Sequence, residues 1–190
     1  MRKDRVFDLG LNLQRKEIKS LFKKIVGCLE NQNSYKICEY DLVYGGSNLL
    51  EFRDKHTDMN LFHYACSSIH KSGLLLLRKI RKLKGSKYIV KKCLKETNKN
   101  SGRNCLHYIA FSKNYLALQY LAKKATDDVI QAAMMILEGK TGWNVIETCF
   151  TQPAQDQRAA LRTALILVSL SKFHTDYTPR QLEILFSVAS

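Results

Sequence analysis

Residues 101–110, SGRNCLHYIA, have two counterparts in the same short chain. Residues 57–66 read TDMNLFHYAC and residues 141–150 read TGWNVIETCF. Aligning the central asparagines, Asn60, Asn104 and Asn144, places one copy 44 residues after the first and the next 40 residues later. The copies share a turn-forming residue two positions before the asparagine, an apolar residue two after it, and His, His or Glu three after it: Asp58, Gly102, Gly142; Phe62, Leu106, Ile146; His63, His107, Glu147.

Helix capping explains this pattern. Asparagine is a preferred N-cap residue, because its side-chain oxygen accepts a hydrogen bond from a free N–H of the first helical turn. Glycine or aspartate just upstream suits a tight turn. Glu147 stands three residues after Asn144, which is the capping-box spacing, and His63 and His107 hold the same position in the other copies. Each copy therefore predicts a turn, an asparagine cap and a short apolar helix.

Two further helices are predicted in each unit. Ser86 and Thr126 each stand 18 residues before the next capping asparagine and open the segments SKYIVKKCLKET and TDDVIQAAMMILEG. Their apolar residues recur with the spacing of a helix buried on one side. The segments GLLLLRKIRKL (73–83) and NYLALQYLAKKA (114–125) lie between them and the asparagine-capped helices. We therefore predict an all-α fold of three-helix units, with the four-residue length difference between the first and second helices.

Atypical helices are expected at both ends, because terminal units of a repeat array have only one neighbour. Residues 14–30 carry an apolar helical stripe. Residues 178–189 begin with Thr178 as cap and Pro179 at the first helical position. Residues 31–58 predict an irregular connection, or, as an alternative, a decayed repeat copy at Asn48-Leu49-Leu50. The predicted organisation is 1–53, an N-terminal capping helix and connection; 54–172, the repeats; and 173–190, a C-terminal capping helix.

The turn-cap-helix segment resembles the start of an ankyrin repeat, whose pattern is Gly-x-Thr-Pro-Leu-His-x-Ala. The second copy matches through Gly102, Leu106, His107 and Ala110, and the first through Phe62, His63 and Ala65; the third keeps Gly142 and Ile146 but has Glu147 in place of histidine. Asparagine replaces threonine, proline is absent, and the period exceeds the usual ~33 residues by the length of one more helix. The resemblance implies an ankyrin-like helical solenoid with capping helices at both ends.

Ankyrin-like modules act as adaptors, inhibitors or localisers, so the resemblance implies a protein partner and no reaction. Divergent arrays rich in lysine and asparagine are similar to those of secreted bacterial effectors or of large DNA viruses that act on a host. Met59, Arg103 and Trp143 precede the three caps and are predicted at the turn tips as partner-binding residues. Tryptophan and arginine are enriched among interface anchors. The alternative for Trp143 is that it covers the edge of the neighbouring unit's core.

The composition agrees with a single globular domain or repeat array. The chain has 190 residues, of which 45% are hydrophobic and 25% charged, and it has no apolar run long enough for a membrane span. The N-terminus lacks the apolar stretch of a secretory signal peptide. None of the six cysteines forms a CxxC pair. We therefore expect buried free thiols in a reducing compartment, the cytoplasm or nucleus, or the host cytosol for an effector.

The net charge of +14 is unevenly distributed. Residues 71–99 contain eleven lysines and arginines against one acid, Glu96, and so carry +10 of it. Eight of these residues are predicted on outward helix faces as an anion-binding surface: Arg78, Lys79, Arg81, Lys82, Lys84, Lys91, Lys92 and Lys95. Such a face attracts acidic protein, nucleic acid or anionic lipid, or is simply a solvated surface. Only Tyr88 is aromatic nearby, which gives little basis for base stacking.

An enzyme is the third hypothesis and has no positive signal. Cys105 lies two residues before His107, but on the repeat interpretation the cysteine packs and the histidine serves a helix start. The phosphate-binding, zinc-protease and nucleophile-elbow motifs are absent. We predict no cofactor and no metal site. Replacing Cys105 with alanine is expected to destabilise the fold by roughly 1–2 kcal/mol through lost packing.

Overall fold

The chain is all-α wherever its structure is described. That structure, a computed structural model, describes residues 14–31, 36–37, 39–68, 71–83, 86–124, 127–151 and 157–170. Those residues form ten helices and no strand, which confirms the all-α prediction. None of the ten helices combines the length and apolarity needed to cross a bilayer. The C-terminal capping helix predicted within 173–190 lies outside the described residues.

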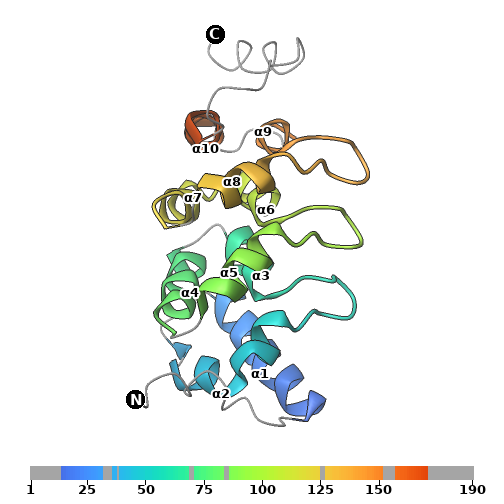
Figure 1. Cartoon of the computed structure of the whole chain (residues 1–190), viewed down its shortest axis with the longest axis vertical. Coiled ribbons are helices and arrows are strands. Elements are labelled where there is room, and N and C mark those ends of the chain that lie inside the picture. The colour runs from blue at the N-terminus through green and yellow to red at the C-terminus, as the bar shows by residue number, and fades with distance from the viewer. Residues whose placement is uncertain are drawn as a thin grey trace.

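The helices stack in three columns (Figure 1). Each helix of a column contacts the next one in it, and the columns are α1–α3–α6–α9, α4–α7–α10 and α2–α5–α8. The bounds are α1 Arg15–Glu30, α2 Glu39–Glu51, α3 Leu61–Ser67, α4 Lys71–Lys82, α5 Ser86–Lys95, α6 Cys105–Ser112, α7 Tyr115–Ala122, α8 Asp127–Met134, α9 Val145–Thr148 and α10 Gln157–Leu170. Three helices therefore make one layer, and successive layers bury their apolar sides against each other.

The three asparagines cap helices as the sequence predicts. Each asparagine has an extended backbone, and its side chain accepts a hydrogen bond from the backbone N–H three residues later. The donors are His63, His107 and Glu147, at 2.9, 3.1 and 2.9 Å. The side chain of each donor residue in turn accepts a hydrogen bond from the N–H of its asparagine. Two otherwise unpaired helix-start amides are thus satisfied in every copy.

Each capped helix is preceded by the same loop, and we name these loops by their residues, 52–60, 96–104 and 136–144. In each, one backbone pair closes the base: the N–H of Asp54, Asn98 or Glu138 donates to the carbonyl of Met59, Arg103 or Trp143, at 2.9, 2.8 and 2.8 Å. A residue with positive φ follows each tip: Asp58, Gly102 and Gly142. The loops project from one side of the stack (Figure 1), and together we call them the loop edge.

Gly102 is the position in the loop edge where a side chain would be hardest to accommodate. Its φ is +75°, and an added Cβ would lie 2.3 Å from the backbone nitrogen of Gly139 in the next loop. We expect Gly102→Ala to lower the free energy of unfolding by about 2–3 kcal/mol, from the left-handed backbone and the clash together. Chemical denaturation measures this difference.

Gly142 supplies the matched control. Its φ is +69°, but nothing lies within 4 Å of its added Cβ. Gly142→Ala should therefore cost only about 1 kcal/mol, from the backbone conformation alone. Asp58 shows that the first copy accepts a side chain at this position, with φ +55°. Equal losses for the two glycine variants would contradict the close approach of loops 96–104 and 136–144.

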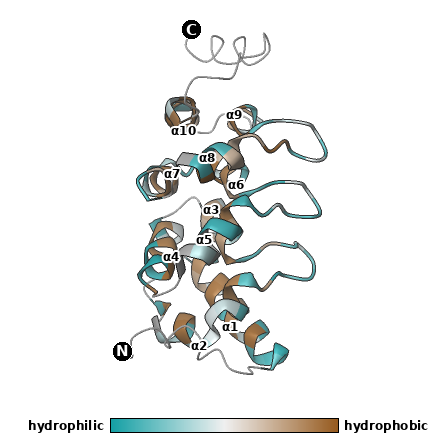
Figure 2. Ribbon diagram, viewed as in Figure 1, coloured by the Kyte–Doolittle hydropathy of each residue, from teal (hydrophilic) through white to brown (hydrophobic). Residues whose placement is uncertain are grey.

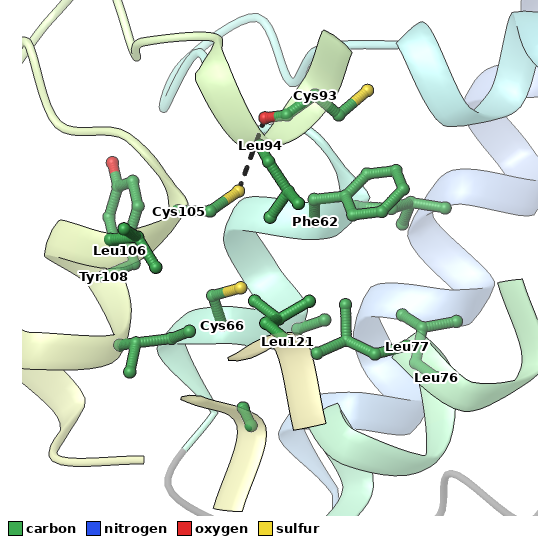
Figure 3. Close-up of a cluster of buried hydrophobic side chains, with 14 of the residues drawn as sticks. Phe62, Cys66, Leu76, Leu77, Cys93, Leu94, Cys105, Leu106, Tyr108 and Leu121 are labelled. Carbon is green, nitrogen blue, oxygen red and sulfur yellow. Dashed lines mark hydrogen bonds between the residues drawn. The ribbon is translucent and has the colours of Figure 1, made fainter. Parts of the chain in front are cut away.

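The core runs through the stack between the columns. Figure 3 shows Phe62 and Leu94 from neighbouring columns beside Cys66, Cys105 and Leu106. All five side chains are at most 1% exposed. Figure 2 shows hydrophobic residues gathered on the helices and hydrophilic residues along loops 52–60 and 96–104. The capped helices α3 and α6 are therefore fixed by packing on several sides, and the loop edge is held by that packing.

The irregular connection predicted for residues 31–58 is wrong in part, because α2 spans Glu39–Glu51. Gly46 has φ 52° and ψ −147° and bends α2 in its middle, so adjacent glycines hid a helix from the sequence pattern. Leu49 and Leu50 are completely buried. They stand 44 residues before Cys93 and Leu94 of α5, which α2 contacts. The first layer therefore repeats the third helix of a unit. The alternative of a decayed asparagine-capped copy at Asn48-Leu49-Leu50 is wrong, because Asn48 lies inside α2 and caps no helix.

The predicted place of the four-residue length difference is also wrong. Lys71 of α4 and Tyr115 of α7 each begin ten residues after the start of the preceding capped helix. The difference follows instead in the second helix, since α4 has 12 residues and α7 has 8. The additional turn of α4 contributes one fully buried side chain, Ile80, and otherwise basic residues. Extra length in the first unit therefore adds positive charge at the end of α4.

Candidate functional site

The three residues predicted as partner contacts lie at the base of their loops rather than at the tips. Met59, Arg103 and Trp143 are half-buried, and their carbonyls close the loops. The placement at the tips is therefore wrong, although the equivalence of the three positions is confirmed. The physical reason is that the chain has already turned back towards the helix at the residue before an N-cap. Whether the three bind a partner stays a prediction.

Arg103 has a structural role that the sequence did not reveal. Its Nε donates to Oε1 of Glu138 at 2.9 Å, and Glu138 is only 4% exposed. Its guanidinium also lies 4.6 Å from the ring centroid of Phe111. Arg103 thus joins loop 96–104 to loop 136–144. Met59 packs on the core, and the carbonyl of Trp143 lies 3.3 Å from Nε2 of His107.

The exposed tips are residues 55–57, 99–101 and 139–141, apart from the half-buried Ser101. Each tip carries one exposed lysine: Lys55, Lys99 and Lys140. A hydroxyl also recurs three residues before every capping asparagine, in Thr57, Ser101 and Thr141. Each hydroxyl accepts a hydrogen bond from the backbone N–H two residues later, at 3.2–3.3 Å. This repeated Thr/Ser was the sequence signal that could have located the tips.

Hydrogen bonds between neighbouring loops fix the loop edge. Arg53 donates to Asp58 and to Glu96, both at 2.9 Å, and so spans loops 52–60 and 96–104. The N–H of Lys99 donates to Oδ2 of Asp58 at 2.6 Å. Between the second and third loops, the N–H of Gly139 donates to the carbonyl of Ser101 at 3.1 Å. The tips therefore keep fixed positions relative to one another.

The basic surface predicted on 71–99 is exposed only in part. Arg78, Arg81 and Lys82 of α4 are exposed, and the guanidinium of Arg78 lies 5.8 Å from the ring centroid of Tyr120. Lys79 is half-buried, and its Nζ donates to the carbonyl of Ile37, so its outward placement is wrong. The segment before α2 packs beside that turn and covers the lysine. Lys84 lies outside the described residues.

The three lysines of α5 differ in their surroundings. Lys91, Lys92 and Lys95 are all exposed, as predicted. Nζ of Lys92 lies 3.1 Å from Glu51 and 3.9 Å from Glu96, and the hydrogen bond to Glu51 raises the pKa of Lys92. Among the described acids, none forms an ion pair with Lys91 or Lys95. These two lysines therefore keep their charge available to an anion.

The buried thiols of Cys105 and Cys149 have raised pKa values and pack in the core. Cys105 is completely buried, and desolvation raises the pKa of its thiol well above the ordinary value. Burial likewise raises the pKa of Cys149 to about 12. Cys105 is therefore a protonated packing residue. The described ranges hold no group of three His, Cys, Asp or Glu side chains able to bind a metal ion.

Five of the six cysteines are described, and all five are free. Cys66, Cys93, Cys105 and Cys149 are buried as expected, whereas Cys28 is half-buried. Cys38 lies outside the described residues.

No protein-family model, no curated protein and no solved structure matches this chain. The candidate surfaces are therefore defined by geometry alone: the loop edge, and the exposed basic residues of α4 and α5.

Proposed function

We propose that this chain is an ankyrin-like helical solenoid that binds a protein partner through its loop tips and concave helical surface. Three features support the proposal: three equivalent loops, a reciprocal asparagine cap after each loop, and columns of helices that contact their neighbours in order. Repeat proteins of this construction use an extended surface rather than a catalytic pocket. The proposal includes no cofactor and no reaction, and the free thiols favour a reducing compartment.

The observation that carries the proposal is the ladder of hydrogen bonds between the loops. A surface that is already ordered loses little conformational entropy on binding, which favours affinity. The tips are polar and exposed, yet Arg53, Asp58 and Gly139 hold them in register. An ordered row of exposed loops at a regular spacing fits a folded protein partner.

The test is to capture proteins from a cell lysate on the purified, immobilised chain, at low and at high salt. We expect a discrete set of proteins to be retained, and to be lost when the tip lysines are reversed in Lys55→Glu/Lys99→Glu/Lys140→Glu. Lys16→Glu/Lys19→Glu/Lys23→Glu on the exposed face of α1 changes the charge equally and should retain the same proteins. Trp143→Ala should weaken capture independently of salt. Equal losses from the tip and α1 variants would contradict binding at the loop edge.

A second candidate function is binding of an anionic partner by the basic surface of α4 and α5. It is favoured by Lys82, Lys91 and Lys95, which are exposed and form no ion pair with a described acid. Uncompensated positive charge of this density attracts phosphate-bearing ligands and makes their affinity fall steeply with salt. Affinity that is unaffected by salt would exclude this candidate while leaving the protein-binding proposal intact.

A further inference from the structure

Three tyrosines are exposed where the first two layers meet. Tyr40 and Tyr44 of α2 are 73% and 40% exposed, and Tyr88 of α5 is 74% exposed. The rings of Tyr40 and Tyr44 stack nearly in parallel, with centroids 5.8 Å apart and an angle of 11° between planes. Large exposed aromatic side chains that occur together mark interaction sites more often than single ones. We call these three residues the tyrosine platform.

The repeat brings the platform together. Tyr88 stands 44 residues after Tyr44, the spacing that also relates Leu50 of α2 to Leu94 of α5. Because α2 and α5 contact each other in one column, the two tyrosines lie on adjacent helices, with Tyr44 on the part of α2 before the bend at Gly46. Tyr40 lies one helical turn before Tyr44. The sequence alone showed only an isolated Tyr88, since α2 was not recognised.

Positive charge borders the platform on two sides. The bond from Lys79 to the carbonyl of Ile37 holds the last turn of α4 beside the segment that leads into α2, and α2 and α4 are in contact. That turn also carries Lys82. On the other side, Lys91 and Lys95 follow Tyr88 along α5. Two of the helices in contact with α2, α4 and α5, thus both carry exposed lysines.

Two of the acids on α2 are already engaged. Asp41 is buried and lies 2.8 Å from Lys24 of α1, and Glu51 pairs with Lys92 of α5. Lys92 is therefore not counted among the lysines that meet a ligand. Lys82, Lys91 and Lys95 are exposed on two of the helices that contact α2, which combines positive charge and aromatic side chains on adjoining helices.

We propose that this surface binds single-stranded nucleic acid, with bases stacked on Tyr40, Tyr44 and Tyr88 and phosphates held by Lys82, Lys91 and Lys95. The inference rests on the second candidate function and names its ligand class. Aromatic faces beside a basic track are the means by which proteins bind single strands without reading their sequence. A duplex keeps its bases inside the stack and so does not use the tyrosines in this way. A membrane surface can also accommodate exposed tyrosines, and the vesicle probe below distinguishes it.

The test is fluorescence anisotropy with labelled oligouridylate and oligothymidylate of equal length. We expect Tyr44→Leu and Tyr88→Leu each to weaken binding roughly tenfold through lost stacking. Tyr44→Phe and Tyr88→Phe keep an aromatic face and should bind as the wild type does. Lys91→Gln/Lys95→Gln should make the slope of log affinity against log salt shallower by about 1.4, since each phosphate contact contributes about 0.7 for single strands.

Controls separate this surface from general attraction to a basic protein. Lys16→Gln/Lys19→Gln on α1 removes the same charge and should change the salt slope less than Lys91→Gln/Lys95→Gln does. A duplex of the same length and phosphatidylserine vesicles serve as the other anionic probes. The inference is overturned if the affinity for the single strands is the same in the Leu and Phe variants of Tyr44 and Tyr88 as in the wild type. It is also overturned if the duplex or the vesicles bind more tightly than the single strands. Either result preserves the second candidate function. Salt-independent binding, or none, overturns both.

Discussion

Replacing Arg103 with alanine is expected to lower the free energy of unfolding by about 3 kcal/mol. The substitution leaves the buried carboxylate of Glu138 without its cationic partner, and an uncompensated buried charge is strongly destabilising. It also removes the contact between the guanidinium and Phe111. Urea denaturation at neutral pH measures the loss, and the midpoint should move without a change in slope.

The paired variant Arg103→Met/Glu138→Leu tests the cause of that loss. Removing both charges and filling the space with apolar side chains should recover most of the stability, because apolar replacement of a buried ion pair is often neutral or favourable. A loss below about 1 kcal/mol in Arg103→Ala would mean that solvent screens the pair. The result also matters for tests of function. If Arg103→Ala weakens partner binding, its loss of stability must be known before the weaker binding is attributed to a lost contact with the partner.

Acidification from pH 6.5 to pH 4 is expected to remove about 3 kcal/mol of stability through His107 alone. This side chain is fully buried, and desolvation lowers its pKa to about 4. The unfolded chain, with a histidine pKa near 6.5, binds the proton more readily in this range. The neutral imidazole therefore makes its full contribution to the free energy of unfolding above pH 6.5. This contribution is lost as the pH falls to the folded-state pKa of about 4.

The measurement is the difference in free energy of unfolding between the wild type and His107→Gln across this pH range. Carboxylates also titrate towards pH 4, but they are common to both proteins and cancel in the difference. We expect the variant to be less stable at pH 7 and to approach the wild type as the pH falls. Parallel curves would show that His107 does not titrate in the way that its burial requires.

Local signals made the repeat predictable. An asparagine cap, a turn residue before it and a partner three residues after it lie within one short segment, so Asn60, Asn104 and Asn144 could be aligned without a structure. The spacing of apolar residues likewise predicted α4, α5, α7 and α8, since one buried helix face imposes its period on the sequence. These features depend on residues close together in the chain.

Features that depend on contacts between layers were not predictable. The bend at Gly46 interrupts the helical period, so α2 was assigned as a connection. The pairing of Arg103 with Glu138 joins residues 35 positions apart, and an arginine before a cap is equally consistent with exposure. The tyrosine platform depends on α2 lying against α5. Missing α2 therefore also removed two of the three tyrosines from the candidate site.

The extra turn of α4 shows where a repeat of this kind tolerates variation. When α4 and α7 are aligned from their first residues, Arg78 of α4 corresponds to Ala122, the last residue of α7. Every residue that α4 adds lies beyond that point, and among them only Ile80 enters the core. Arg81 and Lys82 are exposed, so substitutions at these two positions can change the surface charge while the packing of the layers is kept.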